Sequence, residues 1–97
     1  MVKTPHDYAL QQSYQNALNA ETVIRYQLPE GSQVTLEICD TLGERIRTLV
    51  NGRQPAGYYS ASWNGMDEYN RPVTSGAYLY SLKAGDFVQV RKMTLIR

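Results

Sequence analysis

The chain has 97 residues, which is the size of one compact domain and leaves no room for a catalytic domain beside an accessory one. Hydrophobic residues make up 42% of the sequence, charged residues make up 20%, and the formal net charge is +1. This balance is typical of a folded domain, and it argues against disorder and against a nucleic-acid-binding surface, which needs a clear excess of positive charge.

The residue types that catalysis and metal binding require are scarce. The chain contains one cysteine, Cys39, and one histidine, His6, so a disulfide within the chain and a cysteine-based zinc site are excluded. No Ser-His-Asp or Cys-His arrangement and no phosphate-binding loop is present. We therefore expect no enzymatic activity, no cofactor and no metal site, and we expect Cys39 to be a small residue in a strand.

The first residues carry the pattern of a helix. Thr4 and Pro5 suit the N-cap and the first helical position, and Asp7 suits the positive end of a helix dipole. Four later side chains fall on one helical face, namely Leu10, Tyr14, Ala17 and Leu18. Local propensity therefore favours a helix from about residue 5 to residue 18.

From residue 22 the hydrophobic period becomes two, which indicates strands with one buried face. The alternating inward residues of the segments 22–28 and 34–38 are Ile24, Tyr26, Leu28, Val34, Leu36 and Ile38. The short break between the two segments predicts a hairpin. A turn is expected at residues 40–43, where Gly43 is free to adopt the left-handed conformation.

The alternation continues to the end of the chain. Residues 45–50 predict a third strand with Ile46 inward, and Asn51-Gly52 after it predicts a tight turn. A strand is expected at residues 58–63, with Tyr59, Ala61 and Trp63 inward. Another is expected at residues 76–82, with Tyr78, Tyr80 and Leu82 inward. A hairpin turn at 84–86 then leads to a last strand at residues 87–96. Six strands with no helix between them predict an all-β fold, an antiparallel β-sandwich.

The polar segment 64–70 gathers several oxygen ligands, which are the ligands that calcium prefers. Its spacing does not match the Asp-x-Asp-x-Asp-Gly calcium loop, so we favour a solvated turn. The neighbours Asp67 and Glu68 also do not suit a glycosidase carboxylate pair, because adjacent side chains point apart.

Several stretches, in this order and with this spacing, resemble one protein family. They are Thr22–Pro29, Val34–Ile38, Asp40–Arg45, Leu49-Val50, Ala56-Gly57, Trp63–Gly65 with Asp67, Gly76–Tyr80 and Arg91–Arg97. Together they resemble the immunoglobulin-like C-terminal domain of secreted bacterial proteins, the type IX secretion sorting-domain group, which is related to the immunoglobulin-like domain of the flagellar hook-capping protein. The resemblance implies an immunoglobulin-like sandwich of about seven strands over residues 21–97, preceded by an arm over residues 1–20.

The arm departs from the family pattern. Members usually carry a Tyr-Pro-Asn-Pro-Phe-Asn-Pro stretch, and the matching positions here are Tyr14-Gln15-Asn16-Ala17-Leu18-Asn19-Ala20. The loss of three prolines frees backbone angles and restores three N–H donors. Natural divergence and deliberate engineering both account for these changes. The resemblance implies an extended arm laid along the sandwich, and we favour that over the helix because tertiary context overrides propensity.

The resemblance implies a non-catalytic C-terminal module of a larger exported protein, secreted or at the cell surface. Its partners would be secretion or surface-attachment proteins of the type IX route, with no nucleic acid and no membrane insertion. Two alternatives stay open, an accessory carbohydrate- or surface-binding module and a structural assembly domain of the hook-capping type. Gly43, Gly57 and Trp63 are expected to be structural.

The candidate recognition residues lie in the last two strands. The resemblance points to Gly76 and Tyr78 and to the terminal residues from Lys92 to Arg97. Arg91, Lys92 and Arg97 suit an acidic partner, or equally serve as edge charges that prevent aggregation of sheets.

The sequence also holds eight tyrosines against one tryptophan and one phenylalanine. Tyrosine suits strands that are half buried, because its ring packs while its hydroxyl reaches water. Tyr26, Tyr59, Tyr78 and Tyr80 fall on inward positions of the predicted strands. Tyr58 and Tyr69 fall outward or on a loop, so they are candidates for stacking on a carbohydrate, although we favour simple strand and loop decoration.

Overall fold

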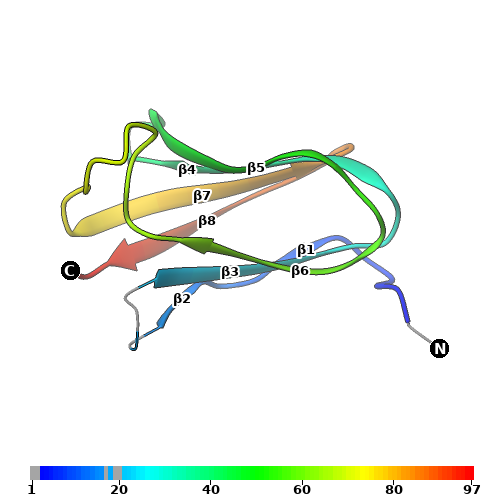
Figure 1. Ribbon diagram of the computed structural model, residues 1–97. Helices are drawn as coiled ribbons and strands as arrows, with labels where there is room; N and C mark the ends of the chain where they lie inside the picture. Colours follow the sequence, from blue (N-terminus) through cyan, green and yellow to red (C-terminus); the bar gives the residue numbers. More distant parts are fainter. Residues whose placement is uncertain (1–2, 17, 19–20) are drawn as a thin grey trace.

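A computed structural model describes residues 3–16, 18 and 21–97. In this part of the chain it has eight strands and no helix, so none that could cross a membrane. The strands are β1 (Ala9–Leu10), β2 (Tyr14–Asn16), β3 (Glu21–Leu28), β4 (Ser32–Cys39), β5 (Arg45–Gln54), β6 (Gly57–Trp63), β7 (Gly76–Ala84) and β8 (Phe87–Leu95). They form two sheets that face each other as a sandwich (Figure 1).

In the first sheet β3 is central. β6 pairs with one edge of β3, and the arm strands β1 and β2 pair with the other edge, one after the other. The second sheet has the order β5-β4-β7-β8. All pairings are antiparallel. The predicted all-β fold, an immunoglobulin-like antiparallel β-sandwich, is therefore confirmed.

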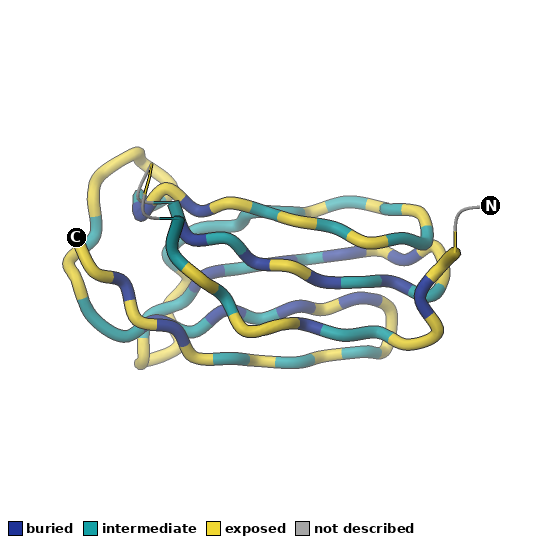
Figure 2. The backbone as a smooth tube through the Cα atoms, turned by 90° about the horizontal axis from the view of Figure 1, so that it is seen from below, coloured by how far each residue is buried: buried dark blue, intermediate teal, exposed yellow. Residues whose placement is uncertain are grey.

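The core lies between the sheets and is filled by alternate residues, so buried and exposed positions follow each other along the strands (Figure 2). The inward positions predicted for β3, β4 and β7 are buried, namely Ile24, Tyr26, Leu28, Val34, Leu36, Ile38, Tyr78, Tyr80 and Leu82. In β6 Trp63 is fully buried, whereas Tyr59 and Ala61 are half-buried, as is Ile46 in β5. Period-two alternation thus located the core correctly.

The arm is extended, as the resemblance implied, and the helix favoured by local propensity does not form in the described residues. Residues 9–10 and 14–16 lie along β3 instead. The reason is burial, because Leu10 becomes part of the core when the arm lies on the sandwich and an isolated short helix is marginal in water. Ala17, which belongs to the predicted helical face, lies outside the described residues.

Two turn predictions are confirmed. The segment 40–43 connects the paired strands β4 and β5, and Gly43 has a φ of 87°. Gly85-Asp86 connects β7 and β8, whose closing pair is Ala84 and Phe87.

Two other predictions were wrong. Segments 22–28 and 34–38 are not a hairpin, because β3 and β4 belong to different sheets and the break between them crosses the sandwich. Alternation shows which side chains face the core, but it does not distinguish a neighbour in the same sheet from one in the opposite sheet. Asn51-Gly52 is not a turn, because both residues lie within β5 and pair with Thr35 and Val34 of β4.

Between β1 and β2 the ladder of the arm is interrupted, and a hydroxyl from the other sheet fills the gap. Tyr80 in β7 donates a hydrogen bond to the Gln11 carbonyl at 2.7 Å and accepts one from the Ser13 N–H at 2.8 Å. The Tyr80 ring is fully buried. One side chain therefore fills the core and satisfies two backbone groups of the arm.

Replacing Tyr80 by phenylalanine tests this role. The variant keeps the ring but leaves the Gln11 C=O and the Ser13 N–H without the hydroxyl, which costs about 1–3 kcal/mol of unfolding free energy. We expect this loss in urea denaturation, with faster amide exchange at Ser13. The matched control is Tyr58→Phe, which alters an exposed tyrosine and should change stability by less than about 0.5 kcal/mol. Equal stability of the two variants would contradict the role assigned to Tyr80.

Candidate functional site

One aspartate organises the loop that follows β6. Asp67 Oδ1 accepts hydrogen bonds from the backbone N–H groups of Tyr69 (2.8 Å) and Arg71 (3.0 Å), and Oδ2 accepts one from Arg71 Nε (3.0 Å). The bond from the Arg71 backbone is the largest cause that lowers the pKa of Asp67 below its ordinary value, and the other two bonds add to it. Both carboxylate oxygens are engaged inside the turn, as expected for a turn-forming aspartate.

The same turn is built a second time between β4 and β5. Asp40 Oδ1 accepts hydrogen bonds from the N–H groups of the residues two and four positions later, at 3.0 and 2.9 Å. The fourth residue of each turn has a positive φ, 87° at Gly43 and 59° at Asn70, and both residue types tolerate that conformation. The third residue is a large exposed hydrophobic in both, Leu42 at 86% and Tyr69 at 77% exposure.

The Asp67 turn is held against the edge of β5 by hydrogen bonds. Glu68 donates its N–H to the Ile46 carbonyl at 3.1 Å, and Glu68 Oε1 accepts the Thr48 N–H at 2.7 Å. Arg47 Nη1 donates to the Asp67 carbonyl at 2.9 Å. The loop therefore covers the start of an edge strand that would otherwise expose backbone groups.

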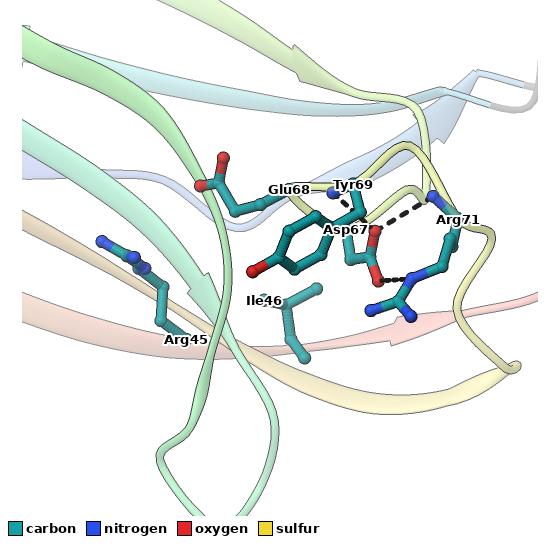
Figure 3. Close-up of a pocket in the computed structure, with 6 residues that line it drawn as sticks. All are labelled: Arg45, Ile46, Asp67, Glu68, Tyr69 and Arg71. Carbon is teal, nitrogen blue, oxygen red and sulfur yellow. Dashed lines mark hydrogen bonds and ion pairs between the residues drawn. The ribbon is translucent and has the colours of Figure 1, made fainter.

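A shallow pocket of about 510 Å³ lies where the loop meets β5. It is lined by Arg45, Ile46, Asp67, Glu68, Tyr69 and Arg71. In Figure 3 the Tyr69 ring lies in the middle of this group, with Arg45 on one side and Arg71 on the other. The Arg71 guanidinium is 4.9 Å from the centre of the Tyr69 ring. A small-molecule pocket is typically deeper and mostly apolar, whereas exposed tyrosine and arginine are typical of protein contacts.

Arg97 reaches the same loop from the last residues. Its N–H donates to Ser75 Oγ at 2.9 Å, its Nε donates to the Val73 carbonyl at 2.5 Å, and its Nη2 donates to the Gly65 carbonyl. Gly65 has a φ of 76°, and a Cβ there would lie 2.6 Å from Arg97 Nη2. Arg97, a predicted recognition residue, therefore holds the loop of its own domain.

Two other predicted recognition residues, Gly76 and Tyr78, lie in β7 and contribute to the sandwich itself. Gly76 opens β7 and pairs with Leu95. Tyr78 is buried, its ring packs edge-on against Trp63 at 5.4 Å, and its hydroxyl donates to the Thr74 carbonyl at 2.7 Å. In the folded domain the Tyr78 side chain belongs to the core.

Arg91 and Lys92 lie where β8 passes the arm. Arg91 Nε donates to the Leu10 carbonyl at 2.6 Å, and the Lys92 carbonyl accepts a hydrogen bond from Gln12 Nε2 at 3.0 Å. Arg91 therefore ties β8 to the arm, whereas Lys92 is exposed. The acidic partner expected for these cations stays a prediction.

The two tyrosines considered for carbohydrate binding are not brought together. Tyr58 is the second residue of β6 and is 67% exposed, whereas Tyr69 lies in the loop beyond the last residue of that strand. β6 has seven residues, so the length of the strand separates the two sites by about 20 Å. They do not form a single stacking platform.

Cys39 and the carboxylates give no sign of a reactive centre. Burial, followed by the nearby carboxylates of Glu37 and Asp40, raises the pKa of the Cys39 thiol and disfavours the nucleophilic thiolate. Within residues 3–16, 18 and 21–97 no cluster of three or more His, Cys, Asp or Glu side chains is arranged to hold a metal ion.

Sequence reasoning predicted turns at 40–43 and 64–70, but it missed that the two share one geometry, and it missed the anchor of the loop. A signal for the turns is visible afterwards, since Asp40 and Asp67 are each followed three residues later by Gly43 or Asn70, residues that tolerate positive φ. The contact of Arg97 with the loop leaves no signal in the sequence, because it joins residues 22 to 32 positions apart.

Acid titration tests the Asp67 turn. The pKa of Asp67 is lower in the folded state than in the unfolded one, so its stabilisation is complete at neutral pH and is lost as the pH falls through the folded value. We expect the carboxyl carbon of Asp67 to titrate by NMR with a midpoint below the ordinary value of an aspartate carboxyl. The amide signals of Tyr69 and Arg71 should move with the same midpoint, and in Asp67→Ala they should not. A midpoint at or above the ordinary value would contradict the assignment.

Comparison with known proteins places the domain in a family. The model of the FlgD Ig-like domain, from flagellar hook-capping proteins, matches residues 12–86, from the segment between β1 and β2 to the β7–β8 turn, and no curated protein matches the chain. The match supports the hook-capping part of the resemblance, and the type IX sorting part has no support from it. The family consists of structural, non-catalytic domains, in agreement with the expectation that the chain is not an enzyme. The chain belongs to the FlgD Ig-like domain family.

Proposed function

We propose that this domain is a structural assembly module of the hook-capping type, which contacts other protein subunits of an extracellular polymer as part of a larger secreted protein. The observation that carries the proposal is the match of the FlgD Ig-like family over residues 12–86. The shallow, charge-balanced pocket supports it, because such a surface suits contact with a protein better than enclosure of a small substrate.

The contact surface in this proposal is the end of the sandwich that carries the two aspartate turns, near the C-terminus in Figure 1. Leu42 and Tyr69 are exposed at the tips of these turns. The hydrogen bonds to Asp40 and Asp67 hold the backbone of each turn in place. Arg45 and Arg71 flank Tyr69 (Figure 3). A turn that is already held in shape loses little conformational entropy on binding, and tyrosine and arginine are residue types that often dominate the binding energy of protein interfaces.

The assembly proposal fits the placement of the other candidate residues better than the alternatives do. Secretion sorting through Tyr78 and Arg97 would need side chains that are engaged inside the domain. Carbohydrate binding through Tyr58 and Tyr69 would need two separate sites. Both hypotheses stay predictions, and the next experiment distinguishes all three.

Deleting residues 21–97 from the full-length protein in its own host separates the functions. An assembly module predicts that the truncated protein is still exported while the extracellular polymer fails to form, as seen by electron microscopy. Retention of the truncated protein inside the cell would contradict assembly and support sorting. Normal export and normal polymer, with loss of retention on a polysaccharide, would support a binding module.

Point variants test the turn surface itself. We expect Leu42→Ser combined with Tyr69→Ala in the full-length protein to reduce polymer assembly at least tenfold, because both exposed anchors are removed. The turns should persist, since Asp40 and Asp67 are unchanged, and the melting temperature of the domain checks this. The control is Tyr58→Ala, which removes another exposed tyrosine at the start of β6 and should assemble normally. Loss of assembly in the control alone would move the contact surface to β6.

A further inference from the structure

The edge of β8 is a second surface with the geometry of an interaction site. β8 is the last strand of its sheet and pairs with β7 on one side. Its ladder begins at the pair Ala84–Phe87, which closes a two-residue hairpin, and the closing pair of such a hairpin is hydrogen-bonded. Because antiparallel pairs alternate, the N–H and C=O groups of the even-numbered residues from Val88 onward point away from β7.

The arm bonds some of the outward groups in the second half of this edge. Gln12 Nε2 donates to the Lys92 carbonyl at 3.0 Å. The Gln15 side chain donates to the Ile96 carbonyl and accepts the Ile96 N–H, each at 3.1 Å. These bonds agree with the outward direction of the even-numbered residues. In the described part of the chain the bonds from the arm to this edge fall at Lys92 and Ile96. The first half of the edge, around Val88 and Val90, is therefore left to solvent.

The open half of the edge also displays apolar side chains. Val88 and Val90 are 61% and 54% exposed and project from the same face of the sheet. Asp86 precedes them and Lys92 follows them, and both are exposed. An uncovered edge with two β-branched residues is a template for another strand, and natural proteins generally cover or charge such an edge.

We propose that this edge binds a second copy of the chain, by antiparallel pairing of the two β8 strands about a twofold axis at Gln89. In this register Val88 of each copy pairs with Val90 of the other. Both are even-numbered, so their outward N–H and C=O groups meet and form four hydrogen bonds across the axis. A twofold interface requires a self-complementary surface, and the segment meets that requirement.

Complementary charges select the register of the two β8 strands and favour a second copy of the chain as the partner. With the axis at Gln89, Asp86 of each copy lies beside Lys92 of the other, so two opposite-charge pairs flank the valines. Moving the axis to Val88 sets Asp86 against Val90, and moving it to Val90 sets Asp86 against Thr94, so both shifts lose the charge pairs. Opposite charges across strands stabilise a pair and like charges destabilise it. This interface lies on the β8 edge and does not use the turn surface of the proposed function.

A charge exchange tests the interface with the chain alone. In sedimentation equilibrium we expect the mass of the wild-type chain to rise with concentration from one chain towards two. Asp86→Lys and Lys92→Asp should each raise the dissociation constant about tenfold, because each creates two like-charge pairs. An equimolar mixture of the two variants should recover the wild-type association, since their heterodimer restores both opposite-charge pairs.

The outcomes that overturn the proposal are distinct. A wild-type chain that stays monomeric at millimolar concentration, variants that associate like the wild type, or a mixture no tighter than its components would each refute it. Melting temperatures of the two variants check that these exposed substitutions leave the fold intact. None of these results bears on polymer assembly by the full-length protein, so this inference and the proposed function fail separately.

A cysteine placed on the axis reports the register. In a Cys39→Ser background, Gln89→Cys should form a disulfide-linked dimer on oxidation, because Gln89 faces itself in a non-hydrogen-bonded pair. The Cα atoms of such a pair lie about 4.5 Å apart, within the range that a disulfide spans. Val88→Cys is the matched control. Its thiol is more exposed but lies off the axis, so faster cross-linking of Val88→Cys would refute the register.

Discussion

The hydroxyl of Tyr80 is the interaction on which the arrangement of the domain depends. The tyrosine belongs to one sheet, its ring is fully buried, and its hydroxyl bonds both sides of the interruption in the arm, which belongs to the other sheet. The interruption lets the arm bend around the open side of the sandwich, where Arg91 bonds the Leu10 carbonyl. The closure of the core at Leu10 and the cover over half of β8 both follow from this position of the arm.

The strands and their inward faces were predictable, because burial acts on every second residue and leaves a pattern along the sequence. Ile24, Val34 and Tyr80 all occupy the predicted side of their strands. The choice of partner strand was not predictable in the same way. The break at 29–31 crosses between the sheets, and Asn51-Gly52 stays in the ladder because pairing with β4 outweighs its turn propensity. Both outcomes depend on contacts between distant residues, which period-two alternation does not encode.

The abundance of tyrosine has a structural explanation that could be predicted only in part. Tyr26, Tyr59 and Tyr78 pack their rings on or near the core and donate their hydroxyls to Gln54 Oε1 and to the carbonyls of Pro55 and Thr74. Phenylalanine would fill the same space and leave those groups unpaired. The candidate site was less predictable, because exposed Tyr69 was identified while the partners that position its loop lie far away in the sequence.

The arm also links the sequence departure to the surface of the domain. Gln15 stands where the resembled family usually has proline, and its amide bonds both backbone groups of Ile96. Proline has no side-chain donor or acceptor, so with proline there the end of β8 would lose this cover. Substitution of the residue at this one position therefore alters how far the free edge of β8 extends. The first half of that edge does not depend on this substitution, because in the described residues Gln12 and Gln15 bond backbone groups of Lys92 and Ile96 and not those of Val88 or Val90. The extent of the edge is thus set by the arm, whereas its self-complementary segment is set by β8 itself.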